Sequence, residues 1–233
     1  MQSIRRAGLP GARELWNISG VNFDFSFAFQ AIVNASTQEI IAFEALVRGP
    51  GGEPSADVFA KVPKARLYEF DQACRLKAIA LARRLNMQTR LNINLFPNAL
   101  YRTTFNVRAT LQASLECGFP TDRITFEVSE AKRLVDYTHL IDMFESYEGF
   151  GFQTAIDDFG TGYSGLKLLV EYQPNYIKLD RNLIANTETD TVRQAIVTGM
   201  GRICRQLAIE LVAEGVETAY EYHWLRGIGI TIF

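Results

Sequence analysis

The feature that most constrains the fold is an alternation of short apolar runs with longer segments of helical periodicity. Eight runs are typical of β-strands, at residues 27–33, 40–47, 90–95, 123–128, 152–157, 176–180, 209–213 and 229–233. From the second run onward, helical patterns separate the strands, which predicts a parallel sheet in an α/β fold. Eight strands in 233 residues fit a (β/α)8 TIM-like barrel, and a doubly wound open sheet is the alternative.

The first strand departs from this rule because its connection to the second is short. Only residues 34–39 separate the two runs, whereas a parallel crossover needs about a dozen residues or more. We therefore expect the first strand to be antiparallel to the second. The last run, residues 229–233, begins an eighth strand.

Composition excludes several classes of protein. Apolar residues make up 48% and charged residues 21%, which is ordinary for a globular domain. The net charge of −2 argues against a DNA-binding surface. Three widely spaced cysteines and the lack of a secretion signal or membrane segment indicate a cytoplasmic protein. Residues 1–20 read as a linker or the end of an upstream domain, and residues 21–233 as the main domain.

Polar side chains occur at or just beyond the ends of six consecutive predicted strands. They are Glu44, Asn94, Glu127 and Glu130, Asp157 and Asp158, Lys178 and Asp180, and Glu214 and Glu217. One such residue is most often a loop cap or a salt-bridge partner. In a barrel, however, the carboxyl ends of the strands surround one mouth, where active sites are built. Carboxylates so close together require cations, and oxygen ligands favour Mg²⁺ or Mn²⁺.

Five carboxylates and one amide of this set suit two divalent ions, with Asp157 placed to bridge them: Glu44, Asn94, Glu127, Asp157, Asp158 and Glu214. Two such ions would activate water and stabilise an in-line displacement at phosphorus.

The glycine pattern of residues 160–165 offers a competing interpretation. It matches GxGxxG after a strand, and Asp180 follows about 20 residues later, as in a dinucleotide-binding fingerprint. We reject this interpretation because Asp157 and Asp158 would face the pyrophosphate without a cation. A mobile loop that becomes ordered over bound metals fits the glycines better.

Several motifs together resemble the EAL domain family of cyclic di-GMP phosphodiesterases. The residues that give the family its name are Glu44-Ala45-Leu46, followed here by Val47-Arg48. Further matches lie at residues 92–97, 126–130, 157–163, 177–181 and 212–218, in the family's order. The resemblance covers nearly the whole chain and implies a barrel whose first strand is antiparallel.

The resemblance also implies roles for individual residues. One metal ion would be held by Glu44, Asn94, Glu127 and Asp157, and the other by Asp157, Asp158 and Glu214. Lys178 would contact the attacked phosphate or its water, and Glu130 would anchor the glycine loop. Glu214 is the first candidate for activating the water, and Lys178 is the second. Candidate substrate contacts are Gln30, Arg48, Asp180 and Glu217.

The implied activity is hydrolysis of cyclic di-GMP to linear pGpG with two Mg²⁺ or Mn²⁺ ions, in bacterial second-messenger signalling. Implied partners are a second copy of the chain, bound through helices beside the glycine loop, and an upstream sensor domain. Three features depart from the family pattern: residues 49–54 replace a longer segment containing tryptophan, Ala31 replaces a proline, and the final Gln-Gly motif is absent. The absence of that motif implies a truncated eighth strand with an unpaired edge.

Two other functions remain as alternatives. One is a catalytically silent receptor that binds the nucleotide or a protein partner. The other is a glycosidase barrel that uses two of the carboxylates, which Asn94 and Lys178 fit poorly.

Overall fold

Seven strands form one sheet in the order in which they occur along the chain. The structure is a computed structural model that describes residues 21, 23–96, 103–130, 137–162 and 165–233. The strands are β1 (Ser26–Asn34), β2 (Glu39–Arg48), β3 (Arg90–Asn94), β4 (Ile124–Ser129), β5 (Gln153–Phe159), β6 (Tyr176–Leu179) and β7 (Glu210–Ala213). β1 is antiparallel to β2, and every later neighbouring pair is parallel. The sequential order excludes a doubly wound sheet, whose strand order reverses at a switch point.

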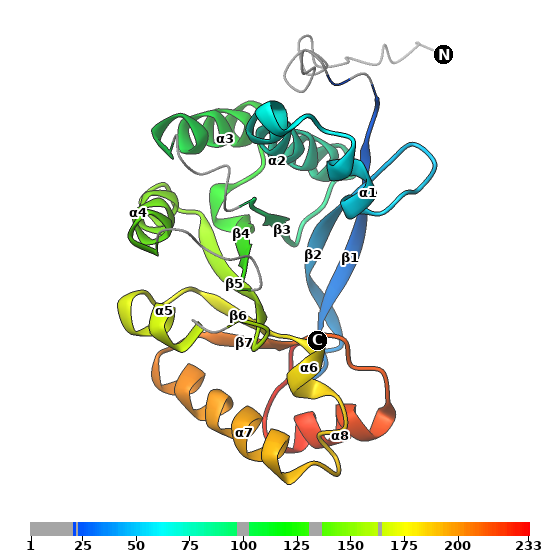
Figure 1. Ribbon diagram of the computed structural model, residues 1–233, viewed down its shortest axis with the longest axis vertical. Coiled ribbons are helices and arrows are strands. Elements are labelled where there is room, and N and C mark those ends of the chain that lie inside the picture. Colours follow the sequence, from blue (N-terminus) through cyan, green and yellow to red (C-terminus); the bar gives the residue numbers. More distant parts are fainter. Residues whose placement is uncertain (1–20, 22, 97–102, 131–136, 163–164) are drawn as a thin grey trace, which may run out of the picture.

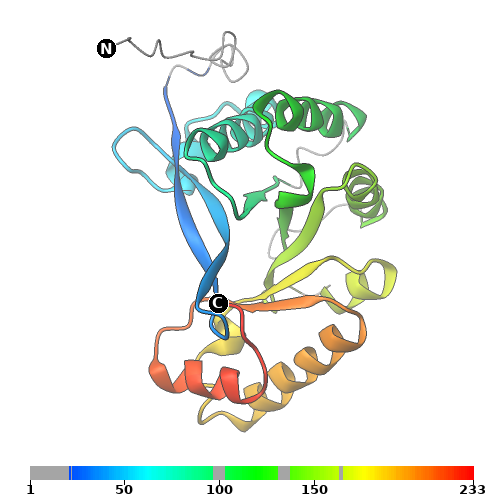
Figure 2. The ribbon, with the colours of Figure 1, turned by 180° about the vertical axis from the view of Figure 1, so that it is seen from behind.

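The sheet curls into a barrel, as Figures 1 and 2 show, and residues 231–233 join its two edges. Ile232 forms an antiparallel bridge with Asn34 of β1 and a parallel bridge with Val212 of β7. Val33 and Phe233 exchange backbone hydrogen bonds of 2.7 and 3.0 Å. The predicted eighth strand is therefore represented by isolated bridges, which meet β1 where that strand ends. The antiparallel first strand and the barrel class are confirmed.

The helices lie around the outside of the curled sheet (Figure 1). They are α1 (Ser55–Ala60), α2 (Leu67–Arg84), α3 (Thr103–Cys117), α4 (Tyr137–Glu148), α5 (Gly165–Glu171), α6 (Arg181–Ile184), α7 (Thr191–Gln206) and α8 (Ala219–Gly227). The short helices α1 and α6 were not predicted, because neither is long enough to show a helical repeat. Among the described residues, no helix is long and apolar enough to cross a lipid bilayer.

The two faces of each barrel strand differ in chemistry because side chains alternate along a strand. On β3, Leu91 and Ile93 are buried in the apolar core with the helices, whereas Asn92 and Asn94 lie on the opposite face. β4 repeats the pattern, with Phe126 and Val128 in the core and Glu127 between them. The main core therefore lies between the sheet and its helices. The inward faces of the strands carry the polar groups of the mouth, and a smaller apolar cluster of Ile32, Ala42, Val212 and Ile232 lies beside the inward Arg90 and Tyr176.

Candidate metal centre

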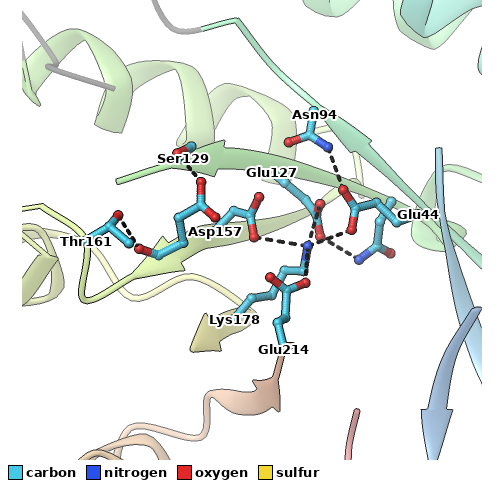
Figure 3. Close-up of polar contacts among 10 residues, drawn as sticks. Glu44, Asn94, Glu127, Ser129, Asp157, Thr161, Lys178 and Glu214 are labelled. Atoms are coloured by element: carbon cyan, nitrogen blue, oxygen red, sulfur yellow. Dashed lines mark hydrogen bonds and ion pairs between the residues drawn. The ribbon is translucent and has the colours of Figure 1, made fainter. Parts of the chain in front are cut away.

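Lys178 lies at the centre of the barrel mouth, surrounded by carboxylates from four strand ends (Figure 3). Its Nζ lies 2.7 Å from Glu214 Oε1, 2.9 Å from Glu44 Oε2, 3.0 Å from Asp157 Oδ1 and 3.1 Å from Glu127 Oε2. Only 1% of the lysine side chain is exposed, and none of the Glu127 side chain is. Four carboxylates thus share one buried ammonium, which leaves the mouth strongly negative.

The pKa values of these groups reflect both burial and crowding. Burial, together with the neighbouring acids, raises the pKa of Glu127 well above its usual value, although Lys178 opposes the shift. Burial, partly offset by Lys178, likewise raises the pKa of Glu214 to about 7. Burial disfavours the charged form of Lys178, but the surrounding carboxylates hold its pKa well above the usual value. An additional cation would relieve this excess of negative charge.

The acids form two groups that share Asp157. Glu44, Glu127 and Asp157 each place one oxygen within 4.8 Å of the others, and so do Asp157, Asp158 and Glu214. The residues present therefore fit two hard divalent cations that have Asp157 as a common ligand.

Asp158 joins this arrangement because the backbone turns at the end of β5. The register between β5 and β6 shifts between Ile156 and Phe159, and Asp158 has a φ of +53°. On a regular strand, adjacent aspartates would point to opposite faces. The turn brings both to the mouth, where Ser129 Oγ donates a hydrogen bond of 2.5 Å to Asp158 Oδ2.

Two asparagines on β3 hold the acids of the neighbouring strands. Asn94 Nδ2 lies 2.8 Å from Glu44 Oε1, and Asn92 Nδ2 lies 2.7 Å from Glu127 Oε1. Sequence reasoning selected Asn94 as a ligand but did not assign a role to Asn92 or Ser129. The signal was available, because Asn92 lies two residues before Asn94, and Ser129 two after Glu127, on the same faces of their strands.

Glu130 ties the glycine loop to the end of β4. Its two carboxylate oxygens accept hydrogen bonds from Gly160 N at 2.7 Å and from Gly165 N at 2.6 Å. A Cβ at position 165 would lie 2.8 Å from Glu130 Oε1 and 2.5 Å from the Phe159 ring, so only glycine fits there. A carboxylate of the chain itself thus takes N–H groups that a bound pyrophosphate would need. Residues 163 and 164 of the predicted loop lie outside the described residues.

The four predicted substrate contacts have different local environments in the structure. Gln30 on β1 is paired directly with Glu44 on β2, and therefore shares its face of the sheet. Arg48 ends β2, and its guanidinium donates to Val47 O at 2.9 Å. Asp180 caps α6 by accepting from Asn182 N at 2.8 Å. Glu217 pairs with Arg181 at 3.0 Å, and 68% of its side chain is exposed.

A cavity of about 440 Å³ adjoins the centre beside Glu44 and Asn94. It extends between β2 and β3 on one side and α1 and α2 on the other. Phe27, Phe59 and Phe96 contribute aromatic surface to its lining.

Comparison with known proteins places this geometry in a family. The family model described as "EAL domain" matches residues 19–233. A standalone EAL protein from Vibrio cholerae O395, solved in its c-di-GMP-bound form, shares 46% identity at a TM-score of 0.86, over 91% of this chain and 89% of that chain. BlrP1 from Klebsiella pneumoniae, solved with manganese and cyclic di-GMP, shares 37% identity at a TM-score of 0.86, over 90% of this chain and 54% of that chain.

One sequence relative is described as an antirepressor and not as a phosphodiesterase. The blue light- and temperature-regulated antirepressor BluF from Escherichia coli is 32% identical over 208 residues, which is 89% of this chain. The chain spans about half (52%) of the length of BluF. Because the family model covers most of the sequence and the acids of its motifs converge at the barrel mouth, the chain belongs to the EAL domain family.

Proposed function

We propose that this chain is a metal-dependent phosphodiesterase that hydrolyses cyclic di-GMP to linear pGpG. The observation that carries the proposal is the convergence of Glu44, Glu127, Asp157 and Glu214 on one point, with Asp157 common to both acid groups. Similarity to cyclic di-GMP-bound structures supports the choice of substrate.

Two Mg²⁺ or Mn²⁺ ions would supply Lewis acidity at the phosphoryl oxygens and make water a better nucleophile. Glu44, Asn94, Glu127 and Asp157 would hold one ion, and Asp157, Asp158 and Glu214 the other. In the reaction, water adds to phosphorus and the P–O3′ bond breaks. The product then carries a 5′-phosphate and a free 3′-hydroxyl, which takes up a proton.

The protein's own groups would orient this reaction. Glu214 is 29% exposed, the most open of the four acids around Lys178, and is our first candidate for accepting the water's proton. Lys178 fixes Glu214 at 2.7 Å and offers positive charge to the phosphoryl group. Glu130 would anchor the glycine loop by accepting hydrogen bonds from the backbone N–H groups of Gly160 and Gly165.

Substrate contacts are assigned to the edge of the mouth. Gln30 and Arg48 would bind the nucleotide from the side of β1 and β2, with Arg48 at a phosphate. Asp180 and Glu217 would contribute from the loops after β6 and β7. The aromatic cavity beside Glu44 offers room for part of the nucleotide.

The test is turnover of cyclic di-GMP by the full-length protein, followed by chromatographic separation of pGpG. We expect hydrolysis with Mg²⁺ or Mn²⁺ and none with EDTA. Absence of hydrolysis with either metal would overturn the proposal.

A partner-binding function is the second candidate, favoured by the similarity to the antirepressor BluF. A protein of this class binds its partner, or the nucleotide, without cleaving it. Binding of cyclic di-GMP in EDTA, combined with no turnover in Mn²⁺, would favour this candidate.

We also propose that two copies associate through α5. Leu166 and Val170 lie four residues apart on this helix and are 59% and 77% exposed. A light-scattering mass that halves in the double variant Leu166→Asp, Val170→Asp would support this assignment. A monomeric wild-type protein would contradict it.

A further inference from the structure

Glu221 is a buried acid that contacts the loop after β7, residues 214–218, which carries Glu214. Its residue is 1% exposed, and it lies in the first turn of α8. Its carboxylate accepts hydrogen bonds from the backbone N–H groups of Asn186, Glu217 and Thr218, at 3.1, 3.0 and 3.2 Å. Burial raises its pKa, but Arg181 and these donors outweigh burial and set the pKa at about 2. The side chain is therefore charged at neutral pH.

Arg181 balances this charge and adds contacts between the same two segments. Its Nη1 lies 2.9 Å from Glu221 Oε2 and 3.1 Å from Oε1, and its Nη2 lies 3.0 Å from Glu217 Oε2. The same Nη1 donates to Gly215 O at 2.6 Å. The guanidinium therefore joins the segment after β6 to the segment after β7.

The side chain of Arg181 lies so close to Gly215 that only glycine fits at position 215. Gly215 has a φ of +65°, and a Cβ there would lie 2.9 Å from Arg181 Cδ. Gly215 directly follows Glu214, whose backbone N donates to Leu179 O at 3.1 Å. Arg181 follows Lys178 by three residues. Lys178 and Glu214 form a 2.7 Å contact, and each is followed closely in sequence by a residue of the junction formed by Arg181, Gly215 and Glu221.

We propose that Arg181 and Glu221 are positioning residues that hold Glu214 in place for the second metal ion. A helix cap alone requires only the reciprocal hydrogen bonds of Thr218 and Glu221. Glu221 also contacts Arg181 and Asn186, and capping of α8 does not require these contacts. The acids of the first group, Glu44 and Glu127, come from other strands and do not depend on this junction.

This inference rests on the proposed function, because it assumes two bound ions, and it is tested by metal binding as well as by turnover. The test variant is Arg181→Met, with Arg181→Lys to restore the charge. The matched control is Arg193→Met. Arg193 is 37% exposed against 32% for Arg181, pairs with Asp190 and donates to Asn182 O. It belongs to α7 and, within the described residues, makes no ion pair or hydrogen bond with the loop after β7.

The measurement is a Mn²⁺ titration by calorimetry and electron paramagnetic resonance, with thermal melting in metal-free buffer. We expect two ions in the wild type and in Arg193→Met. In Arg181→Met, the second ion should bind about tenfold more weakly or worse, as when a partner that orients a metal ligand is lost, while the first is unchanged. Arg181→Lys should recover part of that affinity. In turnover, kcat should fall.

Equal affinity for the second ion in folded Arg181→Met would overturn the inference, as would equal weakening of both ions. If Arg181→Met does not fold, Glu221→Gln, which preserves side-chain shape, decides by the same criteria. A wild type that binds two ions without hydrolysis would contradict the proposed function alone. A wild type that binds fewer than two ions would overturn both.

Discussion

In the part of the chain that the structure describes, Lys178 is an inward cation at one end of the barrel and Arg90 at the other, and the two are balanced differently. At the mouth, Lys178 faces four carboxylates within 3.1 Å. At the floor, where the parallel strands begin, Arg90 packs over the Tyr176 ring, 4.5 Å from its centroid. Arg90 also donates to the Tyr176 hydroxyl, which in turn donates to Gln153 Oε1 at 3.1 Å. The nearest acid there is Glu210, at 3.7 Å.

The two ends of the barrel therefore differ in how completely the charges within them are balanced. The floor balances its cation with the Tyr176 ring, the Tyr176 hydroxyl and a single ion pair to Glu210, although the Nε of Arg90 is buried without a hydrogen-bond partner. The mouth concentrates acids that one lysine cannot neutralise, so it is an environment for additional cations. Such a division agrees with the general behaviour of barrels, in which the carboxyl ends of strands carry chemistry and the amino ends carry stability.

The largest effect should follow from removing the acid that both groups share. Asp157→Asn takes a ligand from both ions, so turnover should fall about 10³-fold or more, equivalent to about 4 kcal/mol of transition-state stabilisation. Steady-state kinetics with Mn²⁺ measure the loss. Melting in metal-free buffer is the control, and it should not show a lower temperature, because the variant relieves repulsion among the acids. Turnover within tenfold of the wild type would exclude Asp157 as the shared ligand.

Removal of the mouth cation should destabilise the metal-free protein. Lys178→Met leaves buried acids without a counter-charge, at a cost of about 3 kcal/mol in the free energy of unfolding. Mn²⁺ should restore much of this stability, because bound ions neutralise the same acids. Urea denaturation with and without Mn²⁺ provides the measurement. An unchanged midpoint without metal would show that the acids are protonated rather than balanced by Lys178.

The corresponding change at the floor should cost less and should not respond to metal. Arg90→Met removes a hydrogen bond and a cation–π contact, worth about 1–2 kcal/mol together. The same denaturation series tests it, and the gain from Mn²⁺ should equal that of the wild type. Preferential rescue of Arg90→Met by Mn²⁺ would contradict the division between the two ends.

The smallest effect should come from a single hydrogen bond at the mouth. Ser129→Ala removes the donor to Asp158 Oδ2, which should cost about 1 kcal/mol or roughly fivefold in turnover. Kinetics at several Mn²⁺ concentrations would separate weaker metal binding from slower chemistry. An effect as large as that of Asp157→Asn would mean that Ser129 has a more direct role.

The alternation of strand and helix patterns predicted an α/β fold with a parallel sheet and favoured a barrel, but only the sequential strand order of the structure excluded a doubly wound sheet. The short connection of residues 34–39 predicted the antiparallel pairing of β1 and β2, since a parallel return requires a longer chain. The acids of the mouth were also predictable, because strand ends in a barrel must meet. The helices α1 and α6 were missed, since six or four residues show too little periodicity.

The sequence by itself determined which residues gather at the mouth, because strand order and side-chain alternation fix the face on which each residue lies. Only the tertiary structure decided how they are arranged there. The turn at Asp158, the placement of Lys178 between four acids and the junction of Arg181 with Gly215 and Glu221 depend on side-chain contacts between segments remote in sequence. Local periodicity carries no information about such contacts, because they form only when the closed barrel brings those segments together.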